Sequence, residues 1–212
     1  YYKNYPDWAP ADSIFYDEDK KVLHLLEEMM EEYQLLLQEI QACRACPLCQ
    51  AKMHTVPGDG NLNADIMIIG EGPGAEEDKQ GLPFVGAAGK LLDQMLDTIG
   101  LTREQVYISN IVKCRPPANR VPKPDEVAAC IGYLEKQIEM VNPKIIVLLG
   151  ATALNNWFSK DMRITKVRGQ WFEKQGRHVI ATFHPAALLR DPRKKPDSFD
   201  DFLSIKQKLS EI

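Results

Sequence analysis

Residues 64–74, ADIMIIGEGPG, are the stretch of sequence that decides the fold. The first part, ADIMIIG, is an apolar run with the length and composition of a buried strand. The glycines that follow mark a turn, and a pattern with helical spacing, KLLDQMLDTIG, begins at residue 90. A strand, a glycine turn and a helix in this order form the repeating unit of α/β proteins.

Strands and helices alternate along most of the chain. Short apolar runs that predict strands occupy residues 64–70, 106–112, 144–150 and 178–183. Patterns with helical spacing occupy residues 90–99, 125–141, 151–158 and 198–209. This alternation predicts a parallel sheet covered by helices on both faces. Ligands of such sheets bind beyond the carboxyl ends of the strands, so we expect Glu71, Asn110 and His184 to share one crevice.

Charge divides the chain into two parts. Residues 1–40 carry ten acidic and three basic side chains, whereas the remaining residues carry 20 acidic and 23 basic ones. We expect an irregular tail over residues 1–17 and one acidic amphipathic helix over residues 19–42, which packs on the domain, binds a protein partner or is simply solvated. Residues 41–212 are expected to form a single domain. No apolar run approaches the ~20 residues of a transmembrane helix.

The five cysteines predict a metal or cluster site rather than disulfide bonds. Their number is odd and the sequence has no signal-peptide pattern, so we expect a reducing, cytoplasmic environment. Cys43 and Cys46 form a C-x2-C pair, and Cys114 and Cys130 supply two more thiols. Four thiolates suit zinc and a 4Fe-4S cluster alike, so spacing alone does not choose between them. Cys49 either competes with Cys46 or is a small core residue, and we expect the latter.

Acidic residues crowd the glycine turn. Glu71, Glu76, Glu77 and Asp78 lie in or shortly after GEGPG, where their charges would repel a phosphate. The turn also lacks a complete G-x-G-x-x-G pattern, which disfavours a nucleotide-binding oxidoreductase. Taken alone, GEGPG is best interpreted as a plain turn between a strand and a helix.

Four motifs together carry a resemblance to a known family. They are GEGPGAEED (70–78), GLPFVGAAGKLL (81–92), YISNIVKCRPPANRVP (107–122) and HPAALLR (184–190). With the cysteines, they make residues 40–209 resemble the family 4 uracil-DNA glycosylases, the iron–sulfur members of the uracil-DNA glycosylase superfamily. The resemblance implies a three-layer αβα sandwich with a central four-stranded parallel sheet. It also implies a 4Fe-4S cluster on Cys43, Cys46, Cys114 and Cys130.

The resemblance further implies a DNA repair activity, in which uracil is flipped out of DNA and its N-glycosidic bond is hydrolysed to leave an abasic site. The residues implied to bind uracil are Gly70, Glu71, Gly72, Gly74, Phe84, Asn110 and His184. The glycines let backbone N–H groups approach the base, Phe84 stacks on it, and Asn110 pairs with its O4 and N3–H edge, which cytosine presents in reverse. His184 donates to O2 and stabilises the departing uracil anion.

The group that orients the attacking water is less clearly marked. Other branches of the superfamily carry an Asp at the position of Gly72. Here the alternatives are Glu71, Asn110 and backbone groups, and we expect Glu71 to orient the water. A branch that traps uracil covalently uses a His in an insert after the second strand. Residues 115–124 contain neither, so we expect hydrolytic turnover.

Contacts to single- or double-stranded DNA are expected around the crevice of a monomeric enzyme. Leu188 or Leu189 would fill the gap left by the flipped nucleotide. Phosphate contacts are expected from two basic runs, which comprise Lys113, Arg115, Arg120, Lys123, Arg190, Arg193, Lys194 and Lys195. The alternative is a non-catalytic nucleic-acid-binding or partner-docking protein that keeps the fold and the cluster. The presence of Glu71, Phe84, Asn110 and His184 favours the enzyme.

Overall fold

The protein is described by a computed structural model over residues 14–212, with side chains from residue 20 onward. It divides into two compact units, with the boundary between Gln38 and Glu39. Helix α1 (Ile14–Ala42) contains neither glycine nor proline, so nothing interrupts it before the cysteine-containing segment. The predicted tail falls partly on residues 1–13, which lie outside the described residues. Its last part, residues 14–17, already belongs to α1, so the helix begins five residues before the predicted start.

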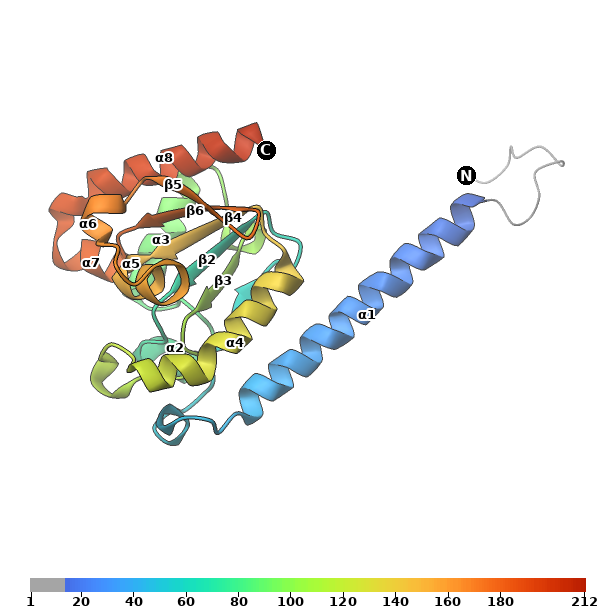
Figure 1. Ribbon diagram of the computed structural model, residues 1–212, viewed down its shortest axis with the longest axis horizontal. Coiled ribbons are helices and arrows are strands. Elements are labelled where there is room, and N and C mark those ends of the chain that lie inside the picture. The colour runs from blue at the N-terminus through green and yellow to red at the C-terminus, as the bar shows by residue number, and fades with distance from the viewer. Residues whose placement is uncertain (1–13) are drawn as a thin grey trace. The chain divides into compact units, whose positions relative to one another are not determined.

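The second unit is built on one six-stranded sheet (Figure 1). Its strands are β1 (Asp59–Gly60), β2 (Ile66–Gly70), β3 (Tyr107–Asn110), β4 (Ile145–Leu149), β5 (Trp171–Lys174) and β6 (Arg177–Thr182), in the order β1-β3-β2-β4-β6-β5. The four central strands are parallel, whereas β1 and β5 pair antiparallel at the two edges. The predicted four parallel strands are confirmed, and the prediction missed the two short edge strands.

Helices connect the strands. The α-helices are α2 (Ala75–Gln80), α3 (Ala87–Thr98), α4 (Pro124–Val141), α5 (Gly150–Ala153), α6 (Ile164–Val167), α7 (Pro185–Arg190) and α8 (Lys195–Glu211). The remaining turns are the 3-10 segments η1 (Pro47–Gln50), η2 (Arg103–Gln105), η3 (Pro117–Asn119) and η5 (Pro192–Lys194), and a π turn, η4 (Leu154–Phe158). The four helices predicted beyond residue 43 are all present, with α5 and η4 dividing the third of them.

The two faces of the sheet are covered by different helices (Figure 1). Alternate strand residues such as Ile66, Ile68 and Val147 join one buried core with Leu92 of α3 and Phe202 of α8. Helix α4 contacts β3 from the opposite face, because intervening strand residues point that way. The predicted αβα arrangement is confirmed. Within the described residues, no helix combines the length and the apolar character needed to cross a membrane.

Candidate active site

Asn110 lies at the carboxyl end of β3, beside Gly70 of β2. Its side chain is only 1% exposed, and its Oδ1 atom has no hydrogen-bond partner among the described residues. A Cβ atom at position 70 would lie 2.4 Å from this oxygen, so glycine there makes room for the amide. A buried acceptor without a partner costs free energy, which indicates that a ligand completes the site.

Phe84 and His184 form the neighbouring wall. Their rings stack with centroids 5.5 Å apart and an angle of 30° between the planes. Phe84 is buried and has a φ of 51°, in the left-handed region. A Cβ at Gly70 would lie 2.6 Å from the Phe84 ring, so the same glycine serves both Asn110 and Phe84.

His184 follows β6 and caps α7. Its Nδ1 atom accepts a hydrogen bond of 3.1 Å from the Ala186 N–H. The neutral imidazole therefore carries its proton on Nε2, which is left as a donor. Burial lowers the pKa of His184 to about 4, the Arg190 charge acts in the same direction, and Glu77 opposes them. The ring is thus neutral at physiological pH.

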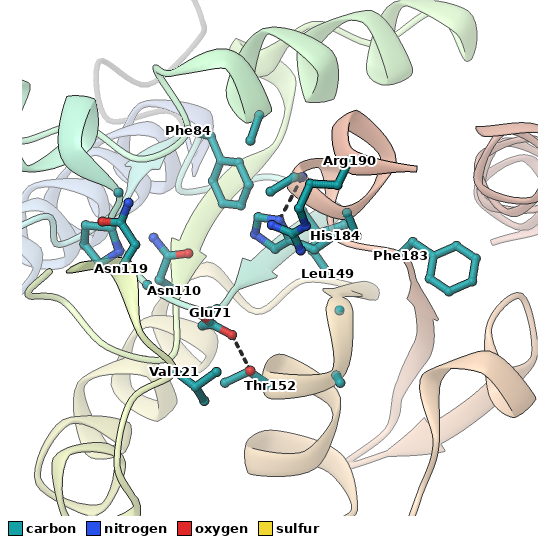
Figure 2. Close-up of a pocket in the computed structure, with 18 of the residues that line it drawn as sticks. Glu71, Phe84, Asn110, Asn119, Val121, Leu149, Thr152, Phe183, His184 and Arg190 are labelled. Atoms are coloured by element: carbon teal, nitrogen blue, oxygen red, sulfur yellow. Dashed lines mark hydrogen bonds between the residues drawn. The ribbon is translucent and has the colours of Figure 1, made fainter. Parts of the chain in front are cut away.

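Glu71 follows β2 directly and is oriented by a threonine. The hydroxyl of Thr152, in α5, donates a hydrogen bond to Oε2 of Glu71. The backbone of Glu71 is fixed as well, because its carbonyl accepts from the Val112 N–H at 3.3 Å. The carboxylate is held beside Asn110 and His184 (Figure 2).

Two of the acidic residues near the glycine turn bind backbone N–H groups. Oε1 of Glu77 accepts from Val85 at 2.9 Å and from Gly86 at 2.8 Å, and Oε2 accepts from Gly74 at 3.1 Å. Asp78 is buried and accepts from the N–H groups of residues 53 and 54. These two carboxylates stabilise the loops of the site, which explains acidic residues where a phosphate-binding turn would have none.

One cavity of about 570 Å³ is bordered by Glu71, Glu77, Phe84, Asn110 and His184. Figure 2 shows Glu71, Phe84, Asn110 and His184 approaching the same space from different elements. Basic side chains at the mouth include Arg120, Arg190 and Lys194. Arg120 is paired with the carboxylate of Glu126, with nitrogen–oxygen distances of 2.6 and 2.8 Å, whereas Arg190 is exposed. The cavity therefore combines a desolvated floor with a cationic rim.

A second, small cavity is lined by all five cysteines. Cys43 and Cys46 border it from the segment after α1, Cys114 from the loop after β3 and Cys130 from α4. Burial raises the pKa of the Cys114 thiol to about 11 and also raises that of Cys130. Within residues 20–212, no three Cys, His, Asp or Glu side chains are grouped as a single metal ion requires.

Comparison with known proteins identifies the family. The model of the uracil DNA glycosylase superfamily matches residues 57–208. The type-4 uracil-DNA glycosylase of Thermotoga maritima is 50% identical over 173 residues, which cover 80% of this chain and 88% of that protein. The type-4 enzymes of Sulfurisphaera tokodaii and Archaeoglobus fulgidus are each 46% identical, over 84% and 83% of this chain and 85% and 92% of their own lengths.

The chain belongs to the type-4 uracil-DNA glycosylase family. The family that the four motifs predicted is therefore confirmed. Of the predicted site residues, the structure brings Glu71, Gly72, Gly74, Phe84, Asn110, His184, Arg120 and Arg190 to one cavity. Gly70 lies behind Asn110 and Phe84 and does not line the cavity. Arg115 also lies outside the lining, where its Nε donates to Asn119 at 2.7 Å.

Three predictions for this type-4 family member need correction. Leu188 is 1% exposed and belongs to the core, because α7 turns it inward, so it is not available as a wedge. Leu189, the alternative, is 45% exposed. Lys113 is buried with its Nζ bound to three oxygens, so it does not contact phosphates. Cys49 is half-buried at the cysteine cavity and is not a core residue.

Several residues of the site escaped the sequence analysis. Thr152 acts through a hydrogen bond to Glu71, which is 81 residues away, so no local pattern indicates it. Glu77 was noticed only as an acidic residue near the turn, and its bonds to the N–H groups of residues 74, 85 and 86 were not predicted. Gly150 has a φ of +88°, and a Cβ there would lie 3.0 Å from that of His184. Its position at the end of the predicted strand 144–150 was the one available signal.

Proposed function

We propose that this chain is a uracil-DNA glycosylase that flips uracil out of DNA and hydrolyses its N-glycosidic bond, leaving an abasic site for base excision repair. The proposal is supported by relatives named type-4 uracil-DNA glycosylases at 46–50% identity. The single observation that carries it is the unpartnered, buried Oδ1 of Asn110 at the floor of the cavity.

Asn110 recognises the edge that distinguishes uracil from cytosine. Uracil N3–H donates to Oδ1, and the amide nitrogen donates to O4. Cytosine has an acceptor at N3 and an amino group at C4, so it would leave both atoms of the amide unpaired. Phe84 stacks on the ring, and the glycines of the 70–74 turn keep the backbone close to the base.

His184 stabilises the charge that bond cleavage creates. As the C1′–N1 bond breaks, its electron pair moves onto the uracil ring, and the sugar becomes an oxocarbenium-like cation. The neutral imidazole donates its Nε2–H to O2, where the negative charge gathers. The water oxygen then attacks C1′, with Glu71 orienting it, and its proton passes to solvent or to the departing base.

DNA is bound at the rim of the cavity, in single- or double-stranded form. Leu189, exposed on α7, fills the gap left by the flipped nucleotide. Arg115, Arg120 and Arg190 contact phosphates. The segment 115–124 carries no His, which supports hydrolysis without a covalent uracil adduct.

We propose that Cys43, Cys46, Cys114 and Cys130 hold a 4Fe-4S cluster. The four thiols line one cavity from three segments, yet no three of them converge as a single zinc ion requires. A cubane fits this donor set better, because each thiolate binds a different iron. When bound, the cluster supplies a cross-link between the segment after α1, the end of β3 and α4.

The cluster assignment is tested by metal analysis. The purified protein is expected to be brown, with roughly four irons per chain. Cys130→Ala should lose the iron, whereas Cys49→Ala should keep it. Zinc in place of iron, or equal loss in both variants, would overturn the assignment.

We propose that residues 41–212 act as a monomeric catalytic domain in the reducing cytoplasm, and that the acidic helix before it binds a protein partner. The superfamily model begins at residue 57, after the end of α1.

The activity is tested with end-labelled oligonucleotides that contain one uracil, thymine or cytosine. Treatment with the protein and then with alkali should cut the uracil strand alone at the modified position. Absence of cutting across buffers and temperatures, with binding retained, would favour a non-catalytic DNA-binding protein of the same fold.

A further inference from the structure

Phe84 is held in an unusual backbone conformation at the wall of the cavity. Its φ of 51° lies in the left-handed region, which is uncommon for a bulky aromatic residue. Its ring nevertheless has a defined place, stacked on His184 (Figure 2). Strained residues persist only where their surroundings fix them. The groups that fix Phe84 therefore bear on base recognition.

Arg103, in η2, binds this segment from behind the cavity. One guanidinium nitrogen donates to the Phe84 carbonyl at 2.7 Å and to Oδ1 of Asp93 at 3.1 Å, and the other donates to the Pro83 carbonyl. The Arg103 side chain is 22% exposed and lies outside the cavity lining. Because Asp93 belongs to α3, the guanidinium ties the Phe84 backbone to a core helix.

The opposite side of Phe84 is bound by an anion. Oε1 of Glu77 accepts the N–H groups of Val85 and Gly86. The carbonyls of Pro83 and Phe84 thus face a cation. The N–H groups of the next two residues face a carboxylate. Gly89 completes the arrangement, since a Cβ there would lie 1.8 Å from the Phe84 carbonyl oxygen.

We propose that Arg103 is a positioning residue for uracil recognition, which holds Phe84 in its left-handed conformation so that the ring is a preformed stacking surface for the base. The proposal rests on the proposed function. A ring that is already ordered loses no further freedom when the base arrives, which favours binding. Lysine cannot replace arginine fully, because a single ammonium lacks the planar fork that reaches two carbonyls and a carboxylate.

The test compares Arg103→Met and Arg103→Lys with a matched control, Arg177→Met. Arg177 also donates hydrogen bonds, to the backbone carbonyl of Gln175 at 3.2 Å and to the side-chain amide oxygen of Asn142 at 2.9 Å. It lies at the amino end of β6, away from the cavity. Two quantities are measured for each: the dissociation constant of free uracil, and single-turnover cleavage as a function of enzyme concentration.

Arg103→Met is expected to weaken uracil binding and to raise the half-saturating enzyme concentration by roughly tenfold, the scale of one lost aromatic stack. The rate at saturation should change much less. Arg103→Lys should be intermediate, and Arg177→Met should match the wild type in both quantities. If Arg103→Met does not fold, Arg103→Lys still tests the proposal, because it should weaken uracil binding in the same direction by a smaller factor.

A double-variant cycle separates positioning from general stability. In the Phe84→Leu background, Arg103→Met should weaken uracil binding little further, because the stacking ring is already gone. A full additional loss, or an Arg103→Met protein that matches Arg177→Met, would overturn the proposal. If the wild type neither cleaves uracil-containing DNA nor binds uracil, the proposed function fails. If it does both, an unaffected Arg103→Met variant rejects only the role of Arg103.

Discussion

Two regions meet at the end of β3: the base pocket, which contains Asn110, and the cysteine cavity, which is bordered by Lys113. Both side chains are 1% exposed. In the pocket, Oδ1 of Asn110 has no partner among the described residues. Beside the cysteines, Nζ of Lys113 donates to Ser109, to the Asn110 carbonyl and to Gln137, at 2.6–2.8 Å.

This difference in hydrogen bonding distinguishes a residue that binds a ligand from a residue that stabilises the fold. A buried polar atom without a partner costs roughly 1–3 kcal/mol, so it persists where a ligand pairs with it. Lys113 has its partners already, and they join β3 to α4 through Gln137. Burial lowers the pKa of Lys113 to about 7, and the nearby Cys130 thiol opposes that shift.

The largest expected effect is on the cleavage rate, and it follows from a substitution in the base pocket. Asn110→Ala should lower the single-turnover rate of uracil cleavage by roughly 10²–10³-fold, because it removes the recognition of the base edge. Its free energy of unfolding should fall less than that of Lys113→Met, since the lost oxygen leaves no protein partner unpaired. Cleavage within tenfold of the wild type would refute the role of Asn110.

At the cysteine cavity, a substitution should change the stability of the protein rather than its activity. Lys113→Met removes three buried hydrogen bonds and should lower the free energy of unfolding by about 3 kcal/mol. Urea titration under anaerobic conditions measures this. The exposed Lys136, paired with Glu39 at 2.8 Å, supplies the control, whose Met variant should lose less than ~0.5 kcal/mol. Equal losses in the two variants would contradict the comparison.

A third prediction concerns the neutral His184. Its pKa is about 4 in the folded protein, below the ~6.5 of an unfolded histidine, so its contribution to stability is present above ~6.5 and is lost as the pH falls toward 4. Between pH 7 and pH 5 the wild type should lose about 2 kcal/mol more than His184→Gln. Parallel stability curves for the two proteins would show that His184 titrates normally.

The smallest effect is expected at the rim. Leu189→Ala should reduce cleavage of double-stranded DNA a few-fold and leave single-stranded cleavage unchanged, because only a duplex has a gap to fill. Leu203→Ala on α8, a similarly exposed leucine, serves as the control. Equal cleavage rates for the two variants on duplex DNA would show that Leu189 does not fill the gap.

The sequence was most informative where strands end. Glu71 and His184 each follow a predicted strand, and Asn110 lies near the end of another. The carboxyl ends of parallel strands share an edge, so the proximity of the three residues was predictable. The edge strands β1 and β5 and the short helices α2, α6 and α7 went unpredicted, because runs of two to six residues are too short to show a period.

Contacts between distant segments could not be predicted. The choice between Leu188 and Leu189 depends on how α7 is turned against the core, and the pairing of Lys113 depends on Gln137, 24 residues away on another element. Arg103 and Thr152 likewise act on loops that are 19 or more residues distant. Hydrogen bonds of this kind follow from the packing of the whole domain.

The most direct test of the central claim, that Asn110 receives the N3–H of uracil, uses a single-stranded oligonucleotide whose uracil is methylated at N3. The methyl group removes the donor and leaves the glycosidic bond, O2 and the stacking face in place. Wild-type protein is expected to cleave the unmodified oligonucleotide and to leave the methylated one intact. Equal cleavage of the two would contradict the account.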